Sequence, residues 1–455
     1  MINAERRYNM DSRKFYKSFF SLYFLLVFQN VITLSVNLTD NIMLGAYSEI
    51  SLSGVTAVNQ IQFVFQQMLG AVGEGIVILG SQYWGKKDSA SVKRVSAIAM
   101  RFAVGIAVVL FLAVSLFPTQ ILGLFTTDSS IVAEGTAYLR IIRFTYLIFA
   151  MTMTLTASMR TVHIVKIAFQ LSVVTLIINF CINYVLIFGH FGLPALGVTG
   201  AAIGTLIARI TEFGIILWFV FVKEQNLKLR PADFLHIDMI LIKDYLRIML
   251  PMFLVNSLWG VNTALQTAVL GHMNTRAIAA NSAASNLFLM VKSMAVGAAS
   301  TASVIIGKAV GEGDMTVVKA YAKRLQIMFA VIGVFSGVLL FFLRIPVLSL
   351  YDLADETREL ANTFLIILSV ICATMSYQMP TNCGIIRGGG SSTYVVKLDL
   401  ISIWCIVVPL SLFMAFVVQA PPAIVVICLN LDQIFKCIPA FIKANYGHWA
   451  KKLTR

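Results

Sequence analysis

The sequence has 455 residues, of which 58% are hydrophobic and 12% are charged, and its mean hydropathy is +0.85. Soluble domains carry roughly 25% charged residues, so this composition excludes a soluble globular protein. The formal net charge of +14 would suit a nucleic-acid partner. We expect no such partner, because the basic residues gather in alternate connections between apolar segments.

Twelve apolar segments are long enough to cross a bilayer as helices, which requires about 20 residues. The alternation of a membrane β-barrel is absent, so the sequence predicts an all-α membrane protein. The predicted spans, in chain order, are 15–44, 52–83, 95–117, 131–157, 163–189, 195–222, 241–270, 276–307, 320–343, 357–385, 394–418 and 421–443.

The positions of the lysines and arginines predict the orientation of the chain in the membrane. Most of the 35 lie in the N-terminal segment, in every second connection and in the C-terminal part, with which Lys436 is counted. Basic residues accumulate in cytoplasmic connections. The sequence therefore predicts an even number of spans with both termini in the cytoplasm.

An internal repeat divides the chain near its midpoint. Residues paired at an offset of 226 include Leu44 and Leu270, Gly85 and Gly311, and Asp88 and Asp314. The repeat predicts two pseudo-symmetric six-helix lobes, an N-terminal lobe over 1–222 and a C-terminal lobe over 245–455, joined by a cytoplasmic linker over 223–244. Parallel repeats of this kind are typical of alternating-access transporters. The alternative is that duplication only enlarged the helix bundle.

Polar side chains inside the predicted spans are costly unless they meet partners or a water-filled cavity. In the first span Asn30, Thr33, Asn37 and Asp40 share one helical face, and Asn179 and Asn183 in the fifth span are four residues apart. Similar groups are Asn59, Gln62 and Gln66 in the second span, Asn262 and Gln266 in the seventh, and Asn281, Ser285 and Lys292 in the eighth. Any one of them could cross-link helices, but together they predict a central hydrated cavity.

Asp40 is the acidic residue of most interest, because its repeat mate is the uncharged Gln266. A carboxylate in low-dielectric surroundings can exchange a proton near neutral pH. It can also hold a hard cation together with other oxygen ligands, or serve only a structural role near the outer water boundary. The difference between the two residues predicts that ion coupling lies in the N-terminal lobe.

Four further charged residues lie deep in the predicted spans, namely Glu74, Arg209, Glu212 and Lys292. Lys292, the repeat mate of Gln66, is interpreted as a counter-charge for an anionic group or as a cation of the binding cavity. The alternative is that its side chain extends toward a membrane interface. Arg209 and Glu212 are three residues apart in the sixth span, and we expect them to form an ion pair.

Five short segments occur in order along the chain. They are Asp40-Asn41-Ile42-Met43-Leu44-Gly45, Gly80-Ser81-Gln82-Tyr83-Trp84-Gly85-Lys86, Gly197-Val198-Thr199-Gly200-Ala201-Ala202, Ile306-Gly307-Lys308-Ala309-Val310-Gly311 and Gly384-Ile385-Ile386-Arg387-Gly388-Gly389-Gly390. With the twelve spans and the midpoint linker, they make the sequence resemble the multidrug and toxic compound extrusion (MATE) family over nearly its whole length.

This resemblance implies ion-coupling residues in the N-terminal lobe. Asp40 matches the first-helix acid associated with coupling, and Asn179 matches a polar position of the fifth helix. Asn183 stands where some members carry an aspartate, and Asn256 lies near a glutamate position of others. The predicted substrate-binding residues are Asn37, Asn59, Gln62, Gln66, Asn256, Asn262, Gln266, Asn281 and Lys292.

The resemblance and the polar stripes predict a secondary active antiporter that exports cationic or amphiphilic drugs or metabolites in exchange for protons or sodium ions. The alternative is a flippase for a lipid-linked precursor, although flippases tend to have more cationic cavities. An enzyme is not expected, because the five histidines show no metal-ligand spacing. We expect no cofactor, and no metal apart from a sodium ion at Asp40. We further expect a small organic substrate, surrounding membrane lipids, a monomer, and the bacterial plasma (inner) membrane as location.

Overall fold

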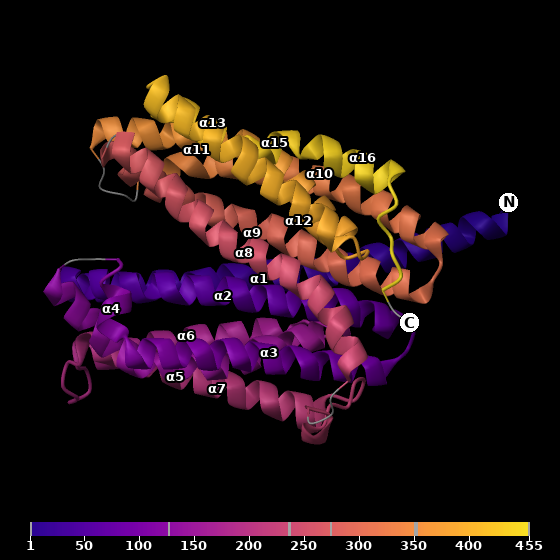
Figure 1. Cartoon of the computed structure of the whole chain (residues 1–455), viewed down its shortest axis with the longest axis horizontal. Coiled ribbons are helices and arrows are strands. Elements are labelled where there is room, and N and C mark those ends of the chain that lie inside the picture. Colours follow the sequence, from indigo (N-terminus) through magenta and orange to yellow (C-terminus); the bar gives the residue numbers. More distant parts are fainter. Residues whose placement is uncertain (1, 126–127, 235–237, 274, 350–353, 454–455) are drawn as a thin grey trace. The chain divides into compact units, whose positions relative to one another are not determined.

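The structure, a computed structural model, describes residues 2–125, 128–234, 238–273, 275–349 and 354–453 (Figure 1). Within these ranges the chain is helical apart from short connections, and no strand occurs. The elements of the first half are α1 (Ile2–Tyr47), α2 (Glu49–Gly85), α3 (Ser89–Leu116), α4 (Pro118–Leu122), α5 (Ser129–Thr161), α6 (Lys166–Phe188), α7 (Gly197–Trp218), η1 (Phe219–Lys223) and η2 (Pro231–Phe234). Those of the second half are α8 (Met239–Met273), α9 (Thr275–Glu312), α10 (Met315–Leu348), α11 (Asp355–Met379), η3 (Pro380–Ile386), α12 (Ser392–Leu400), η4 (Ile401–Val407), α13 (Val408–Leu412), η5 (Phe413–Val417), α14 (Pro422–Leu429), α15 (Asp432–Phe435) and α16 (Cys437–Tyr446).

All twelve predicted spans coincide with helical segments. Among the described residues, 11 helical segments are long and apolar enough to cross a membrane. The remaining predicted span, 241–270, falls within α8, a continuous helix of 35 residues. The prediction of an all-α membrane protein with twelve spanning helices is therefore confirmed.

Contacts between residues divide the chain into two compact units. The N-terminal unit comprises Phe28–Gly80 and Lys87–Phe253, and the C-terminal unit comprises Met1–Val27, Ser81–Lys86 and Leu254–Arg455. Helices α1, α2 and α8 therefore contribute residues to both units. The predicted lobe boundaries at 222 and 245 stay a prediction, because units defined by contacts need not coincide with the halves of a repeat.

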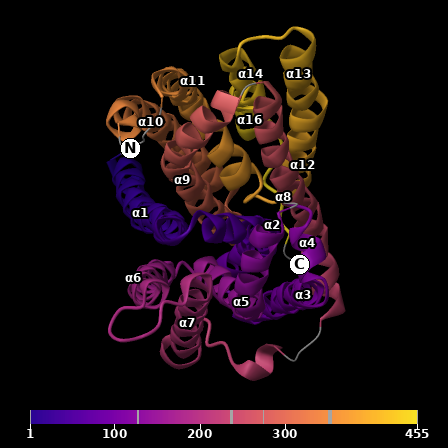
Figure 2. The same ribbon diagram turned by 90° about the vertical axis from the view of Figure 1, so that its left-hand side faces the viewer.

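In the N-terminal unit, α5 packs between α3 and α7, and α6 packs against α7 (Figures 1 and 2). The first part of α8 is fixed to this unit by Tyr245. The hydroxyl of Tyr245, which is fully buried, donates a hydrogen bond of 2.8 Å to the Val72 carbonyl. Gly75 leaves room for the Tyr245 ring, because a Cβ there would lie 3.0 Å from it.

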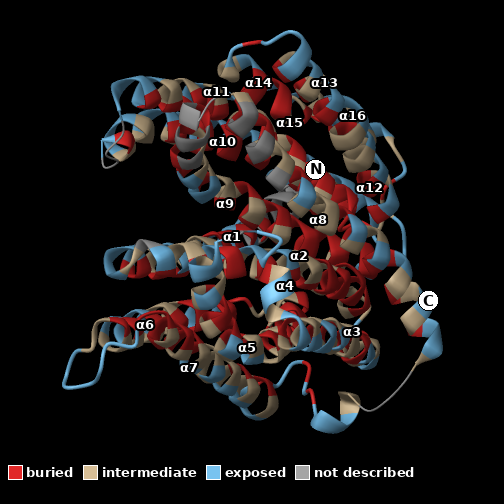
Figure 3. Cartoon of the chain, turned by 60° about the vertical axis from the view of Figure 1, so that its left-hand side comes forward, coloured by how far each residue is buried: buried red, intermediate tan, exposed pale blue. Residues whose placement is uncertain are grey.

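In the C-terminal unit, α9, α10 and α11 pack pairwise against one another, and η3 packs against α9. Their contact faces bury Leu340, Phe364 and Leu365 completely. Figure 3 shows buried and exposed residues side by side along the same helices. On α10 the exposed face is apolar, with Val331 64% and Phe342 70% exposed, which is typical of a helix that contacts lipid.

The ends of α2 and α9 cross at two glycines that are repeat mates, within the C-terminal unit. A Cβ on Gly85 would overlap the Lys308 carbonyl oxygen, and a Cβ on Gly311 would overlap the Gln82 carbonyl oxygen. The contact is reciprocal, because Gln82 and Lys308 are themselves paired at the repeat offset. Glycine at both positions is what allows the two backbones to touch.

The last span is broken near its middle. Residues Asn430 and Leu431 separate α14 from α15, and α16 follows directly after Lys436. A break at membrane depth leaves backbone groups that need partners, so it is tolerated only where protein or water surrounds it. The break therefore places Asp432 and its neighbours in a polar interior of the C-terminal unit.

Candidate functional site

A buried polar cluster in the N-terminal unit contains all three residues predicted to couple the ion. Asn183 Nδ2 donates a hydrogen bond of 2.7 Å to Asp40 Oδ1 and a longer one of 3.4 Å to Asn179 Oδ1. Asn179 Nδ2 donates to Thr205 Oγ1 at 3.2 Å. We call Asp40, Asn179, Asn183 and Thr205 the Asp40 cluster. Asp40 is 9% exposed and the two asparagines are at most 1% exposed, so the carboxylate meets amides in place of water.

Local sequence explains how the Asp40 cluster forms. Asn179 and Asn183 are four residues apart on α6, which places both side chains on one helical face. Asn183 Oδ1 occupies the space that Gly204 of α7 leaves, because a Cβ on Gly204 would overlap it. This buried oxygen accepts no hydrogen bond from any described residue. The cluster therefore holds an oxygen that can take a further donor or a cation.

Two more side chains act on Asp40 electrostatically. Arg209 of α7 interacts with Asp40 and also forms an ion pair of 2.7 Å with Glu212, so the predicted pairing of these two residues is confirmed. Tyr138 of α5 interacts with both Asp40 and Thr205. The positive charge of Arg209 is thus shared between two carboxylates, and Asp40 has no counter-charge to itself.

The other predicted residues of the N-terminal unit lie outside the Asp40 cluster. Asn37 shares a helical face with Asp40 by spacing, yet its side chain is exposed. Asn59, Gln62 and Gln66 on α2 are half-buried, and their side chains form no hydrogen bond with any residue in the described ranges. Their role in binding substrate stays a prediction.

The predicted residues of the second half lie on α8 and α9. Asn262 is buried, and its Oδ1 accepts no hydrogen bond from the described part of the chain. Gln266 Nε2 donates a long hydrogen bond of 3.5 Å to the Leu429 carbonyl, at the break in the last span. Asn281 Oδ1 accepts a bond of 3.5 Å from Ser285 Oγ. Asn256 is half-buried on α8.

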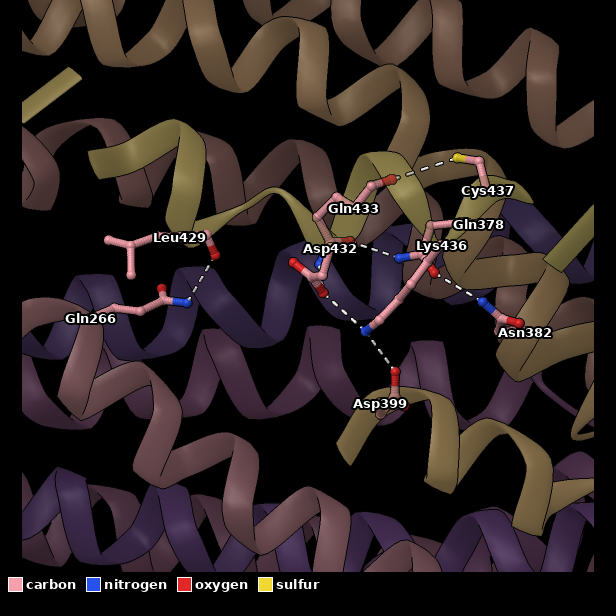
Figure 4. Close-up of polar contacts among 9 residues, drawn as sticks. All are labelled: Gln266, Gln378, Asn382, Asp399, Leu429, Asp432, Gln433, Lys436 and Cys437. Carbon is pink, nitrogen blue, oxygen red and sulfur yellow. Dashed lines mark hydrogen bonds and ion pairs between the residues drawn. The ribbon is translucent and has the colours of Figure 1, made fainter. Parts of the chain in front are cut away.

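A second polar cluster, which the sequence did not predict, surrounds the broken span. Lys436 Nζ lies 2.8 Å from Asp399 Oδ1 and 2.9 Å from Asp432 Oδ2, and the Lys436 side chain is 3% exposed (Figure 4). Gln433 Nε2 also donates to Asp432 Oδ2, at 2.7 Å. We call Asp399, Asp432, Gln433 and Lys436 the Lys436 cluster. It holds two carboxylates with a lysine of the same chain as their shared counter-charge.

A chain of amides leads from η3 into the Lys436 cluster. Asn382 Nδ2 donates to Gln378 Oε1 at 3.0 Å, and Gln378 Nε2 donates to Gln433 Oε1 at 2.7 Å. Every hydrogen bond in this series of amides is donated in the direction of Asp432, so the amides stabilise the negative charge of Asp432. At the far end, the buried Asn382 Oδ1 accepts no bond from the described residues.

Lys292 of α9 lies near this cluster without joining it. Its Nζ is 4.8 Å from the centre of the Trp259 ring, which is a cation–π contact. It interacts electrostatically with Asp432 but forms no ion pair with it or with any other described residue. Lys292 therefore keeps its hydrogen-bonding capacity.

The structure adds residues to the sequence-based site and corrects one assignment. Thr205 was missed, although Thr205, Arg209 and Glu212 are spaced as one stripe on α7. Lys436 was counted with the basic C-terminal part, and this assignment is wrong because its side chain is buried in two ion pairs. The sequence could have predicted this ion pair, since Asp432 and Lys436 are four residues apart inside the predicted span 421–443.

Comparisons with known proteins place this geometry in context. The MatE family model matches residues 26–185 and again 251–413, so the match itself is repeated in the two halves. The chain is 23% identical to the probable multidrug resistance protein NorM of Thermotoga maritima, over 94% of this chain and 92% of the relative. It is 25% identical to the probable multidrug resistance protein NorM of Agrobacterium fabrum, over 84% and 83%.

Solved structures show the same fold. A mutant of the Vibrio cholerae MATE transporter VcmN matches with a TM-score of 0.88 and 16% identity, over 98% of this chain and 99% of that one. The chain thus has the fold of these transporters, with twelve spanning helices in two lobes, as predicted.

Proposed function

The chain belongs to the MatE family of multidrug efflux transporters, and from this premise we propose that it exports small organic molecules in exchange for protons or sodium ions. As a transporter it performs no covalent chemistry on its cargo. The observation that supports the exchange most directly is Asp40, a buried carboxylate whose hydrogen-bonding neighbours are amides. A group in this setting can take up and release a cation as its surroundings change.

The Asp40 cluster offers ligands for either coupling ion. A proton binds to one carboxylate oxygen and needs no further ligand. A sodium ion prefers several oxygens, and the cluster holds Asp40, the Asn183 Oδ1 that lacks a donor, and Thr205 Oγ1. The donor set fits both ions, and the proposal includes both.

Transport then follows from unequal affinities in two states of the molecule. The substrate and the ion each bind one state better than the other, so the binding of one lowers the affinity for the other, and this coupling lets the ion gradient drive export. Asn59, Gln62 and Gln66 of α2 are half-buried and form no side-chain hydrogen bond within the described chain, which supports a hydrated substrate cavity. We further propose that the protein works as a monomer in the bacterial plasma membrane with both termini in the cytoplasm.

Replacement of Asp40 tests the coupling. Purified Asp40→Asn protein in liposomes, under an imposed pH or sodium gradient, should lose gradient-driven transport while it still binds substrate. Coupling free energies of about 1–3 kcal/mol predict that the gradient dependence falls about 5- to 150-fold. Asp233→Asn is the matched control, because Asp233 is an acid outside the spans that pairs with Lys93 at 3.4 Å. Full gradient-driven transport by Asp40→Asn would show that coupling lies elsewhere.

The flippase alternative makes a different prediction in cells. The names of the relatives favour drug export, since both NorM proteins are described as probable multidrug resistance proteins. Deletion of a drug exporter should sensitise a host to drugs and leave its envelope intact. An envelope defect without drug sensitivity would support the flippase.

A further inference from the structure

Lys292 is a membrane-embedded ammonium group without an acidic partner. It lies in the candidate span Ala283–Glu312, and its side chain is half-buried. Its one close contact with a charged or aromatic group of the described chain is the Trp259 ring, at 4.8 Å. A charged side chain at membrane depth is costly and normally faces a partner or a hydrated cavity.

Within the described chain, the one acid that acts on Lys292, Asp432, forms its ion pair with another lysine. Asp432 acts on Lys292 through space, yet its Oδ2 accepts from Lys436 at 2.9 Å and from Gln433 at 2.7 Å. Lys436 also holds Asp399 at 2.8 Å. Figure 4 shows both carboxylates turned toward the Lys436 ammonium. Lys292 therefore has no hydrogen-bond acceptor or ion-pair partner among the described residues.

The helix face that carries Trp259 offers two further groups that could contact a ligand of Lys292. Trp259 and Asn262 are three residues apart on α8 and therefore share a face. Trp259 offers a flat apolar ring, and Asn262, which is 5% exposed, offers a buried acceptor oxygen that has no donor in the described chain. An ammonium, an aromatic face and a single amide acceptor match the few polar groups and the apolar lining of small-molecule sites.

We propose that Lys292 binds the anionic group of the exported molecule, a carboxylate, sulfonate or phosphate on an aromatic or apolar body. Trp259 packs against that body, and Asn262 Oδ1 accepts a hydrogen bond where the body carries an N–H or O–H group. The Lys436 cluster keeps the nearby acids away from Lys292, so the ammonium stays available for the ligand. The inference rests on the proposed export function and narrows its substrate class to organic anions.

A matched pair of probes separates charge from shape. Naphthalene-2-sulfonate and 2-naphthyltrimethylammonium share a ring system and carry permanent charges of opposite sign. Equilibrium dialysis with the full-length protein in uncharged detergent measures the binding of each. A hydrogen bond to a charged group is worth about 1.5–3 kcal/mol, so Lys292→Gln should weaken sulfonate binding about 10- to 150-fold. Binding of the ammonium probe should change less than about twofold.

Two control variants complete the design. Lys292→Arg keeps the positive charge and should retain most of the sulfonate binding. Lys308→Gln removes an exposed lysine of the same helix, which pairs with Glu312 at 3.9 Å, and should change neither probe. Equal weakening of both probes in Lys292→Gln would show that Lys292 has only a structural role and would overturn the inference. Competition by anionic phosphatidylglycerol in preference to the sulfonate would also overturn it, because the occupant would then be a lipid.

Transport in liposomes distinguishes this inference from the proposed function. If the wild-type protein exports the ammonium probe but neither binds nor exports the sulfonate, the export function stands and the organic-anion inference is wrong. If the sulfonate binds in a Lys292-dependent way but neither probe is transported, the site stands and the export function is wrong. Export of the sulfonate that depends on Lys292 supports both.

Discussion

The Asp40 cluster of the N-terminal unit and the Lys436 cluster of the C-terminal unit both bury carboxylates, but they balance the negative charge differently. Asp40 is held by the amide of Asn183 and shares Arg209 with Glu212. Asp432 and Asp399 share the ammonium of Lys436, which is covalently part of the chain. A carboxylate that is held by neutral amides can exchange a mobile cation. A carboxylate that is paired with a tethered ammonium already has its cation. The comparison therefore predicts that the Asp40 cluster exchanges a proton or sodium ion and that the Lys436 cluster stays fixed.

The largest effect on stability is expected from Lys436→Ala. The substitution leaves two carboxylates without their counter-charge, and removal of one partner of a buried ion pair costs about 3–5 kcal/mol. The free energy of unfolding in detergent micelles, titrated with denaturant, measures the loss. Lys443→Ala is the control on α16. Lys443 Nζ lies 5.0 Å from the centre of the Tyr394 ring, and loss of this cation–π contact should lower the free energy of unfolding by less than about 1 kcal/mol. Equal losses in the two variants would contradict a rigid ion-paired cluster.

An intermediate effect is expected from Asn183→Ala. The variant removes the donor that lies 2.7 Å from Asp40, and a hydrogen bond to a charged group contributes about 1.5–3 kcal/mol. In a double-mutant cycle with Asp40→Asn, the two losses should be less than additive, because Asp40→Asn removes the charge that strengthens this bond and Asn183→Ala removes its donor. Gln170→Ala on the exposed face of α6 is the control, and its free energy of unfolding should be within about 0.5 kcal/mol of the wild-type value. Strict additivity would mean that Asn183 does not act through Asp40.

The smallest effect is expected from Gln266→Ala, which changes the repeat mate of Asp40. Its hydrogen bond of 3.5 Å to the Leu429 carbonyl is long, so the free energy of unfolding should fall by less than about 1 kcal/mol. Transport by this variant should keep its dependence on the imposed gradient, in contrast to Asp40→Asn. If Gln266→Ala abolished that dependence, coupling would not be confined to the Asp40 cluster.

The twelve helices could be predicted from the sequence because a span needs a long apolar segment, and such segments are visible one at a time. Asp40, Asn179 and Asn183 could also be identified, through the spacing of four residues on one helix and the family resemblance. Spacing shows which residues share a face, but it does not show which face is buried. For this reason Asn37 was grouped with Asp40, although its side chain is exposed.

The Lys436 cluster was missed for a different reason. Asp399 belongs to α12, whereas Asp432 and Lys436 belong to the broken last span, so the ion pairs depend on tertiary packing. The sequence contains no proline or glycine at Asn430 and Leu431 that would predict the break. Thr205 was missed because a hydroxyl residue in a membrane helix can satisfy itself by bonding to its own backbone.

The crossing of Gly85 and Gly311 has a consequence for the history of the chain. Each glycine touches the residue that corresponds to the one its mate touches, which is the self-complementary contact of a two-fold symmetric dimer. A six-helix ancestor that paired with a second copy would have needed only one glycine, used twice. In the present chain that single requirement falls on two separate positions. A larger side chain at either one would force the same two backbones apart.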